Sequence, residues 1–265
     1  MSAASMQAQN GATHYVRFRQ GSRTAFGILA GEDVRELSGD YLKGGKPTNA
    51  KHKLKDVKLL APIVPNKIFA MARNYKSHLG TVPPPPRPEF FYKPTTSICG
   101  PGDSIILPKD STDVHYECEL VVVIGKRLKN VSKTEAAAGV FGVTCGNDVS
   151  ERQWQNGPEK DIQWWRAKGS DTFGPIGPSV AAGLKYEDLA IKTRLNGNVV
   201  QDGRTSQLIY DVVTMISFCS KYVALEPGDL VFTGTPGTTK KMAPGDVVEV
   251  DIEGIGVLRN PVTSS

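Results

Sequence analysis

Cysteine is scarce in this chain of 265 residues, and its placement argues against disulfide bonds. The four cysteines, Cys99, Cys118, Cys145 and Cys219, are far apart in the sequence and include no C-x-x-C pair. They lie in apolar stretches, which favours buried free thiols in a reducing compartment. We therefore expect no disulfide framework.

Long hydrophobic runs and blocks of one charge are also absent. No apolar run approaches the ~20 residues of a transmembrane helix, and 32 basic residues are scattered among 27 acidic ones, for a net charge of +5. We expect neither a membrane nor a nucleic-acid partner, whereas a small anionic substrate is compatible with this charge. The start, MSAASMQAQNGATH, lacks the apolar segment and the arginines of targeting peptides. The sequence predicts a cytoplasmic protein, with organellar targeting left open.

Short β-strands dominate the pattern that is present. Alternating or apolar runs predict strands over residues 14–20, 24–30, 67–72, 104–108, 117–125 and 140–148. Asn196-Gly197 is typical of a hairpin turn, and Pro-Gly-Asp occurs three times before an apolar run, at 101–103, 227–229 and 244–246.

The clearest helical pattern covers residues 205–223. It begins with a hydroxyl side chain and places Leu208, Val212, Met215, Cys219 and Tyr222 on one stripe.

These elements predict a mixed α/β fold that is predominantly β, a sandwich or roll with few helices. The boundary that we expect lies in the proline-containing segment LLAPIVPNK, residues 59–67. The predicted parts are a disordered tail (1–12), a small N-terminal β domain (13–60) and a main domain (61–265).

Two glutamates in the segment DVHYECELVVVIG carry the first indication of function. Side chains alternate across a strand, so Glu117 and Glu119 share one face with Val121 and Val123, and the opposite face is apolar throughout. Two carboxylates that lead into buried valines repel each other unless a cation lies between them. The alternative is a solvated strand end with two surface carboxylates.

Asp148 adds a third carboxylate at the predicted end of the strand over 140–148. Because Glu151 follows three residues later, Asp148 also matches the N-cap of a capping box. The two roles are compatible, since a helix needs only one carboxylate oxygen. Three carboxylates without a cysteine partner favour a hard ion, Mg²⁺ or Mn²⁺ before Ca²⁺.

Seven sequence blocks together resemble the fumarylacetoacetate hydrolase superfamily, from about residue 60 to the end. In chain order they are KIFAMARNYKSHL, FYKPTTSICGPGDSIILP, HYECELVVVIGK, CGNDVSERQWQ, RAKGSDTFGPIGP, LNGNVVQDGRTSQLIYDV and LEPGDLVFTGTPGT. The resemblance implies a β-sandwich or roll that holds Mg²⁺ or Mn²⁺ through Glu117, Glu119 and Asp148. It also implies a substrate that is a 2-oxo or 1,3-dicarbonyl acid, and a homodimer.

The resemblance also implies roles for other side chains. Lys168 matches the lysine that supports a developing oxyanion, and His78 matches a lid histidine that serves as the base. The matches to substrate-binding positions are Arg73, Asn74, Tyr75, Arg152, Gln155 and Thr235. Taken alone, a lysine beside arginine and glycine indicates a surface position, and Trp164 and Trp165 either line the pocket or pack.

The lid is where the chain departs from this pattern. The family's glutamate three residues beyond the lid histidine is replaced by Thr81, and the segment GTVPPPPRPEFF is rich in proline, which predicts an extended conformation. Activation of water by a histidine–glutamate pair is therefore in doubt.

Three functions are compatible with these residues. The family favours cleavage of a C–C bond, by hydrolysis or decarboxylation. The alternative is keto–enol tautomerisation or isomerisation of an acid such as oxaloacetate, which needs a proton carrier but no activated water. The third is a protein that has kept the fold without catalysis, and the intact carboxylates and lysine argue against it.

Overall fold

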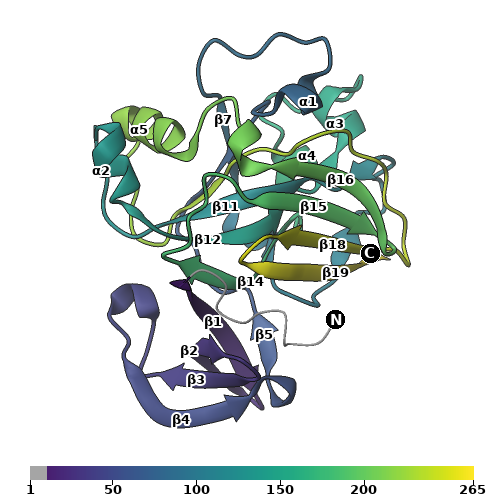
Figure 1. Ribbon diagram of the computed structural model, residues 1–265. Coiled ribbons are helices and arrows are strands. Elements are labelled where there is room, and N and C mark those ends of the chain that lie inside the picture. The colour runs from purple at the N-terminus through teal and green to yellow at the C-terminus, as the bar shows by residue number, and fades with distance from the viewer. Residues whose placement is uncertain (1–10) are drawn as a thin grey trace.

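Two β-sheets form the body of the protein. The computed structural model describes residues 11–265 (Figure 1). The larger sheet has twelve strands, ten of them in the order β4-β3-β2-β1-β14-β12-β11-β17-β6-β7, with β5 paired to β1 and β8 paired to β14. In chain order its strands are β1 (Thr13–Gln20), β2 (Arg23–Ala30), β3 (Asp33–Leu37), β4 (Pro47–Lys53), β5 (Lys58–Leu60), β6 (Ile68–Met71), β7 (Phe90–Lys93), β8 (Ile98–Cys99), β11 (Cys118–Ile124), β12 (Val140–Asn147), β14 (Gly174–Ala182) and β17 (Leu230–Phe232).

A smaller sheet packs against the centre of the larger one. Its order is β16-β15-β18-β19-β9. Its strands are β9 (Ile105–Leu107), β15 (Ala190–Leu195), β16 (Asn198–Arg204), β18 (Val247–Ile252) and β19 (Gly256–Ser264), and β10 (Val114–His115) pairs separately with β13 (Ser150–Glu151). The prediction of a mixed, predominantly β fold is confirmed.

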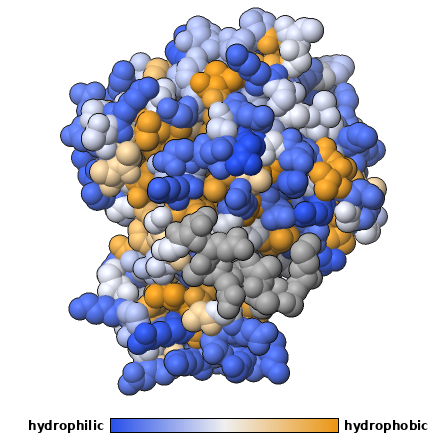
Figure 2. Space-filling model, in the orientation of Figure 1, coloured by the Kyte–Doolittle hydropathy of each residue, from blue (hydrophilic) through white to orange (hydrophobic). Residues whose placement is uncertain are grey.

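The α-helices are short and lie around the sheets. They are α1 (Lys76–Leu79), α2 (Lys133–Ala137), α3 (Arg152–Asn156), α4 (Trp165–Gly169) and α5 (Val212–Tyr222). No helix in the described range is long and apolar enough to cross a membrane. Hydrophilic residues predominate on the face shown in Figure 2, where hydrophobic ones form small groups between them.

The N-terminal strands stand at one end of the large sheet (Figure 1). Strand β1 pairs with β14, from Thr13 opposite Ala182 to Tyr15 opposite Val180. The predicted unit 13–60 therefore continues the sheet of the main body. Of the predicted tail, residues 1–10 lie outside the described range, while Ala12 is buried in the main core.

Strand β11 is buried on both faces, as the alternation of its side chains predicts. Leu120 and Val122 belong to the core cluster that includes α5 and the small sheet. Val121 and Val123 point to the opposite side, into a second cluster with β6 and β17. Strands β12 and β17 pair with its two edges. The strand is therefore fixed in position, and Glu117 and Glu119 lie at its beginning.

The three Pro-Gly-Asp turns are confirmed, each directly ahead of a strand. Their glycines have positive φ, which an L side chain rarely adopts: Gly102 at 76°, Gly228 at 93° and Gly245 at 94°. In each turn the aspartate accepts a hydrogen bond from the amide three residues earlier. The Asn196-Gly197 hairpin between β15 and β16 is also confirmed, with φ of 52° and 82°.

The helix predicted over 205–223 begins later than expected. Residues Thr205–Gln207 form a 3₁₀ turn, and α5 begins at Val212 with Asp211 as its N-cap, where the side chain accepts from the Thr214 amide. The residues between are held elsewhere, because Asn74 exchanges hydrogen bonds with the backbone of Tyr210. Of the predicted stripe, Val212, Met215 and Cys219 are buried, whereas Tyr222 is 70% exposed.

Candidate active site

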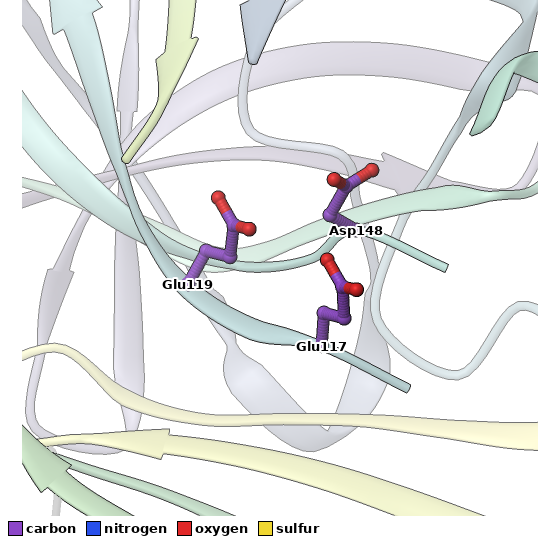
Figure 3. A group of neighbouring side chains, drawn as sticks. All are labelled: Glu117, Glu119 and Asp148. Carbon is purple, nitrogen blue, oxygen red and sulfur yellow. The ribbon is translucent and has the colours of Figure 1, made fainter. Parts of the chain in front are cut away.

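Three buried carboxylates converge at the start of β11, as the sequence predicts. Glu117 precedes the strand, Glu119 lies within it, and Asp148 follows the neighbouring strand β12 (Figure 3). They are 4%, 1% and 1% exposed, and each offers an oxygen within 4.8 Å of the others. The alternative of a solvated strand end is wrong.

Lys168 on α4 lies between two of these carboxylates. Its Nζ is 2.7 Å from Glu117 Oε2 and 2.6 Å from Asp148 Oδ2. Burial opposes the charge, but the two carboxylates hold the pKa of Lys168 above its usual value. The lysine is 3% exposed, so the alternative of a surface position is wrong.

Glu117 is held ionised by two cations. Arg152 donates to its Oε1 at 2.6 Å, while Lys168 binds Oε2. Burial alone would raise the pKa of Glu117, but the charges of Lys168 and Arg152 outweigh it and lower the pKa. This carboxylate is therefore an anion in the folded protein.

Glu119 is in the opposite electrostatic situation. Burial, followed by the charges of Asp148 and Glu117, raises the pKa of Glu119 well above its usual value. Its Oε2 accepts a hydrogen bond from the Gly234 amide at 2.7 Å. Gly234 has φ of 103°, and a Cβ there would approach Asn74 Cβ to 2.8 Å, so only glycine fits where the loop meets this carboxylate.

The donor set fits a hard divalent ion. Carboxylate oxygens are preferred ligands of Mg²⁺, Mn²⁺ and Ca²⁺. Two ligands of one ion are separated by at most twice the metal–oxygen distance, which is about 4 Å for Mg²⁺ and about 5 Å for Ca²⁺. The three oxygens lie within 4.8 Å of one another, so their spacing is close to this range. A cation beside Glu119 would also favour its ionised form.

The N-cap role predicted for Asp148 is wrong. Helix α3 begins at Arg152, and its N-cap is Glu151, whose side chain accepts from the Trp154 amide at 2.6 Å. Residues Ser150–Glu151 first pair with β10, so the helix starts three residues later than the motif indicates. Both oxygens of Asp148 instead accept from lysines.

A small cavity of about 50 Å³ opens above Glu117 and Glu119. Most of the side chains predicted for the site border it. Besides the two glutamates, the predicted residues that line it are Arg73, Asn74, His78, Gln155, Lys168 and Thr235. Residues from five separate sequence blocks are thus brought to one place.

Two predicted substrate-binding residues lie behind this cavity. Tyr75 is fully buried, and within the described chain its hydroxyl has no hydrogen-bond partner. Arg152 contacts Gln155 at 2.6 Å and Thr239 at 2.7 Å as well as Glu117. Neither side chain borders the cavity in this structure.

His78 is held by a loop carbonyl. Its Nδ1 lies 2.7 Å from Gly237 O, so Nδ1 must carry the proton, and the neutral ring has its lone pair on Nε2. The Gly237 amide donates to Ser77 Oγ at 3.0 Å. In the described range, this carbonyl is the hydrogen-bond partner found for the ring, and no carboxylate contacts it.

Arg73 has a backbone conformation that is unusual for a residue with a side chain. Its φ is 56°. Its guanidinium lies 3.1 Å from Glu89 Oε2, and both side chains are partly exposed. The pair joins the turn before α1 to the last residue of the lid segment 80–89, which contains no helix or strand.

Lys93 is a site residue that the sequence did not reveal. It is the last residue of β7, its side chain is 0% exposed, and its Nζ lies 2.7 Å from Asp148 Oδ1. The block FYKP was part of the family resemblance, but a lysine at a strand end ordinarily indicates solvent. Its partner is 55 positions away, so no local pattern identifies the contact.

A larger groove of about 650 Å³ adjoins the cavity. The two share Ala72, Phe91 and Trp164 in their walls. Trp164 therefore lines both spaces, whereas Trp165 lines only the groove and is 66% exposed.

Comparison with known proteins identifies the family. Residues 67–263 match the fumarylacetoacetate (FAA) hydrolase C-terminal family, and residues 13–62 match the Rv2993c-like N-terminal family. The chain belongs to the fumarylacetoacetate hydrolase superfamily, as its sequence blocks indicated.

Three relatives illustrate the range of this similarity. Protein Rv2993c of Mycobacterium tuberculosis is 44% identical over 79% of this chain and 80% of its own. Oxaloacetate tautomerase FAHD2A, mitochondrial, of Bos taurus is 40% identical over 78% of this chain and 70% of its own. The crystal structure of 5-carboxymethyl-2-hydroxymuconate delta-isomerase from Mycobacterium smegmatis superposes with a TM-score of 0.89 and 39% identity, covering 95% of this chain and 100% of that one.

Proposed function

We propose that the protein catalyses keto–enol tautomerisation or isomerisation of a small 2-oxo acid through an enolate. The observation that carries this proposal is the environment of His78. Its ring borders the cavity with Nε2 as the basic nitrogen, and Nδ1 is bonded to a carbonyl instead of a carboxylate. Such a histidine can carry a proton to and from carbon, but it lacks the carboxylate partner that would increase its basicity for the activation of water. The names of the bovine and M. smegmatis relatives agree with this reaction class.

We propose that Glu117, Glu119 and Asp148 hold the cofactor, Mg²⁺ or Mn²⁺, with Ca²⁺ also compatible. The ion would supply Lewis-acid stabilisation of the negative charge that develops on the substrate oxygen. The support is the burial and convergence of the three carboxylates and their oxygen-only donor set.

Side chains of the protein would stabilise the oxyanion, transfer the proton and bind the substrate. Lys168, a buried ammonium at the cavity wall, places positive charge where an oxyanion develops. His78 takes a proton from the carbon beside the ketone, and the protonated ring then gives that proton to the enolate oxygen, which yields the enol, or to another carbon of the enolate, which yields the isomer. The side chains that we assign to substrate binding are those that border the cavity, namely Arg73, Asn74, Gln155 and Thr235. Tyr75 and Arg152, also predicted to bind substrate, would act from behind this wall.

Cleavage of a C–C bond, by hydrolysis or decarboxylation, is the second candidate. The family name favours it. Hydrolysis needs an activated water, and position 81, where the family places the lid acid, is an exposed threonine just beyond α1.

The lid variant Thr81→Glu tests the choice between these reactions. We expect the parent to tautomerise oxaloacetate faster than it hydrolyses acylpyruvates, and Thr81→Glu to shift the ratio toward hydrolysis, because the new acid can polarise His78. Enol absorbance and product acids would be followed in parallel. Thr81→Gln is the matched control, since it has the same size without the charge.

His78→Ala completes this experiment. It should slow both reactions, because each needs a proton carrier beside the enolate. Efficient acylpyruvate hydrolysis by the parent that survives His78→Ala would overturn the proposal.

We also propose a homodimer. In the described range β7 is the end strand of the large sheet, and Tyr92 on it is 58% exposed beside the exposed Trp165 in the groove. Proteins usually cover such an edge. Light scattering should give twice the mass of the chain, and Tyr92→Glu should lower it. A monomeric parent would contradict the proposal.

The cytoplasmic compartment stays a prediction, since the bovine relative is named mitochondrial.

A further inference from the structure

The buried ammonium of Lys93 contacts both members of the Lys168–Asp148 pair. Lys93 Nζ lies 2.7 Å from Asp148 Oδ1, and it also donates to the backbone carbonyl of Lys168. Its side chain is 0% exposed and that of Asp148 is 2% exposed. A lysine is rarely this buried unless its charge is paired.

The carbonyl contact fixes the helix that carries Lys168. Helix α4 covers only Trp165–Gly169, and the carbonyl groups of its last turn have no partners within the helix. A lysine donor near a helix C-terminus satisfies such a carbonyl. Lys93 supplies this donor from β7, a strand that is distant in sequence.

The carboxylate contact fixes the rotation of Asp148. With Oδ1 held by Lys93, Oδ2 is directed to Lys168 Nζ at 2.6 Å. Removal of the ammonium would free Asp148 to rotate and leave one of its oxygens without a partner in a buried space.

We infer that Lys93 is a positioning residue for the proposed reaction, which sets the orientation of Asp148 toward the divalent ion and the place of Lys168 beside the substrate. This inference rests on the proposed function. Outer partners of metal ligands ordinarily change metal affinity or activity by 10–100-fold when they are removed.

The test compares Lys93→Met with Lys67→Met, a change in a partly exposed lysine that also pairs with a buried aspartate but lies far from the site. Lys67 Nζ lies 2.7 Å from Asp229 Oδ2, and that aspartate is 0% exposed, but the pair stands at the opposite ends of β6 and β17 from the triad. Mn²⁺ affinity would be measured by calorimetry or by electron paramagnetic resonance, together with the melting temperature and the separate values of kcat and KM.

We expect Lys93→Met to weaken Mn²⁺ binding by roughly 10–100-fold and to lower kcat at saturating Mn²⁺, with KM nearly unchanged. Lys67→Met should lower the melting temperature while Mn²⁺ affinity stays within about twofold of the parent. Lys93→Arg, which keeps the charge, should recover part of the lost affinity. Lys93→Gln, which introduces a smaller neutral donor, should lose as much Mn²⁺ affinity as Lys93→Met does. It replaces Lys93→Met in the test if that variant does not fold.

The outcomes separate this inference from the proposed function. A parent that binds no Mn²⁺ contradicts the proposed metal site. A parent that binds Mn²⁺ while Lys93→Met or Lys93→Gln binds it equally well refutes the positioning role of Lys93. An equal loss of affinity in Lys67→Met would also refute it, because the effect would then come from general destabilisation.

Discussion

Glu119→Ala should bind no measurable Mn²⁺ and should reduce catalysis to the background rate. Glu119 is the carboxylate whose pKa is raised by burial and by its acidic neighbours, so its ionised form gains most from a divalent cation. Binding to the folded state alone stabilises a protein by ~2.7 kcal/mol at a ligand concentration of 100 Kd. Mn²⁺ should therefore raise the melting temperature of the parent but not that of Glu119→Ala.

A buried glutamate outside the site provides the control for this variant. Glu36 is 5% exposed and pairs with Arg23 and His52 in the N-terminal strands. Glu36→Ala should be less stable than the parent and yet bind Mn²⁺ as the parent does. Unchanged Mn²⁺ affinity in Glu119→Ala would show that the triad is not the metal site.

Lys168→Met should lower kcat by roughly two to three orders of magnitude, the effect of removing one donor to a developing oxyanion. Mn²⁺ should still bind, because the lysine is not a ligand and its removal leaves Glu117 and Asp148 with fewer positive neighbours. Stopped-flow measurement of enol formation, with Mn²⁺ binding measured on the same samples, would separate the two properties.

A surface lysine supplies the comparison. Lys129 donates to the carbonyls of Lys221 and Tyr222 at the end of α5. Lys129→Met should retain the parental kcat. If kcat of Lys168→Met were also parental, Lys168 would have no part in the chemistry.

The sequence predicted most of this site because side chains along strand β11 alternate between its two faces. Alternation along residues 117–124 placed both glutamates on one face, and the core clusters on either side of β11 confirm that assignment. The family blocks then brought in His78 and Lys168, which no local pattern links to Glu117.

Tertiary contacts explain where the sequence failed. Helix α5 begins late because Asn74 binds the backbone of Tyr210, and propensity does not detect a partner 136 residues away. The capping motif at Asp148 was misleading because Ser150 and Glu151 pair with β10, so the helix begins only after them. Lys93 was missed because only the folded chain shows that a lysine at a strand end is buried.

The burial of β11 has a consequence for motion. A strand that is packed on both faces and paired on both edges cannot shift unless the core opens, and such opening needs nearly the full free energy of unfolding. The adjustments that admit a substrate and release a product are therefore expected outside this strand, in a segment without helix or strand such as the lid segment 80–89. Turnover would then follow the opening rate of that segment, while the carboxylates stay still.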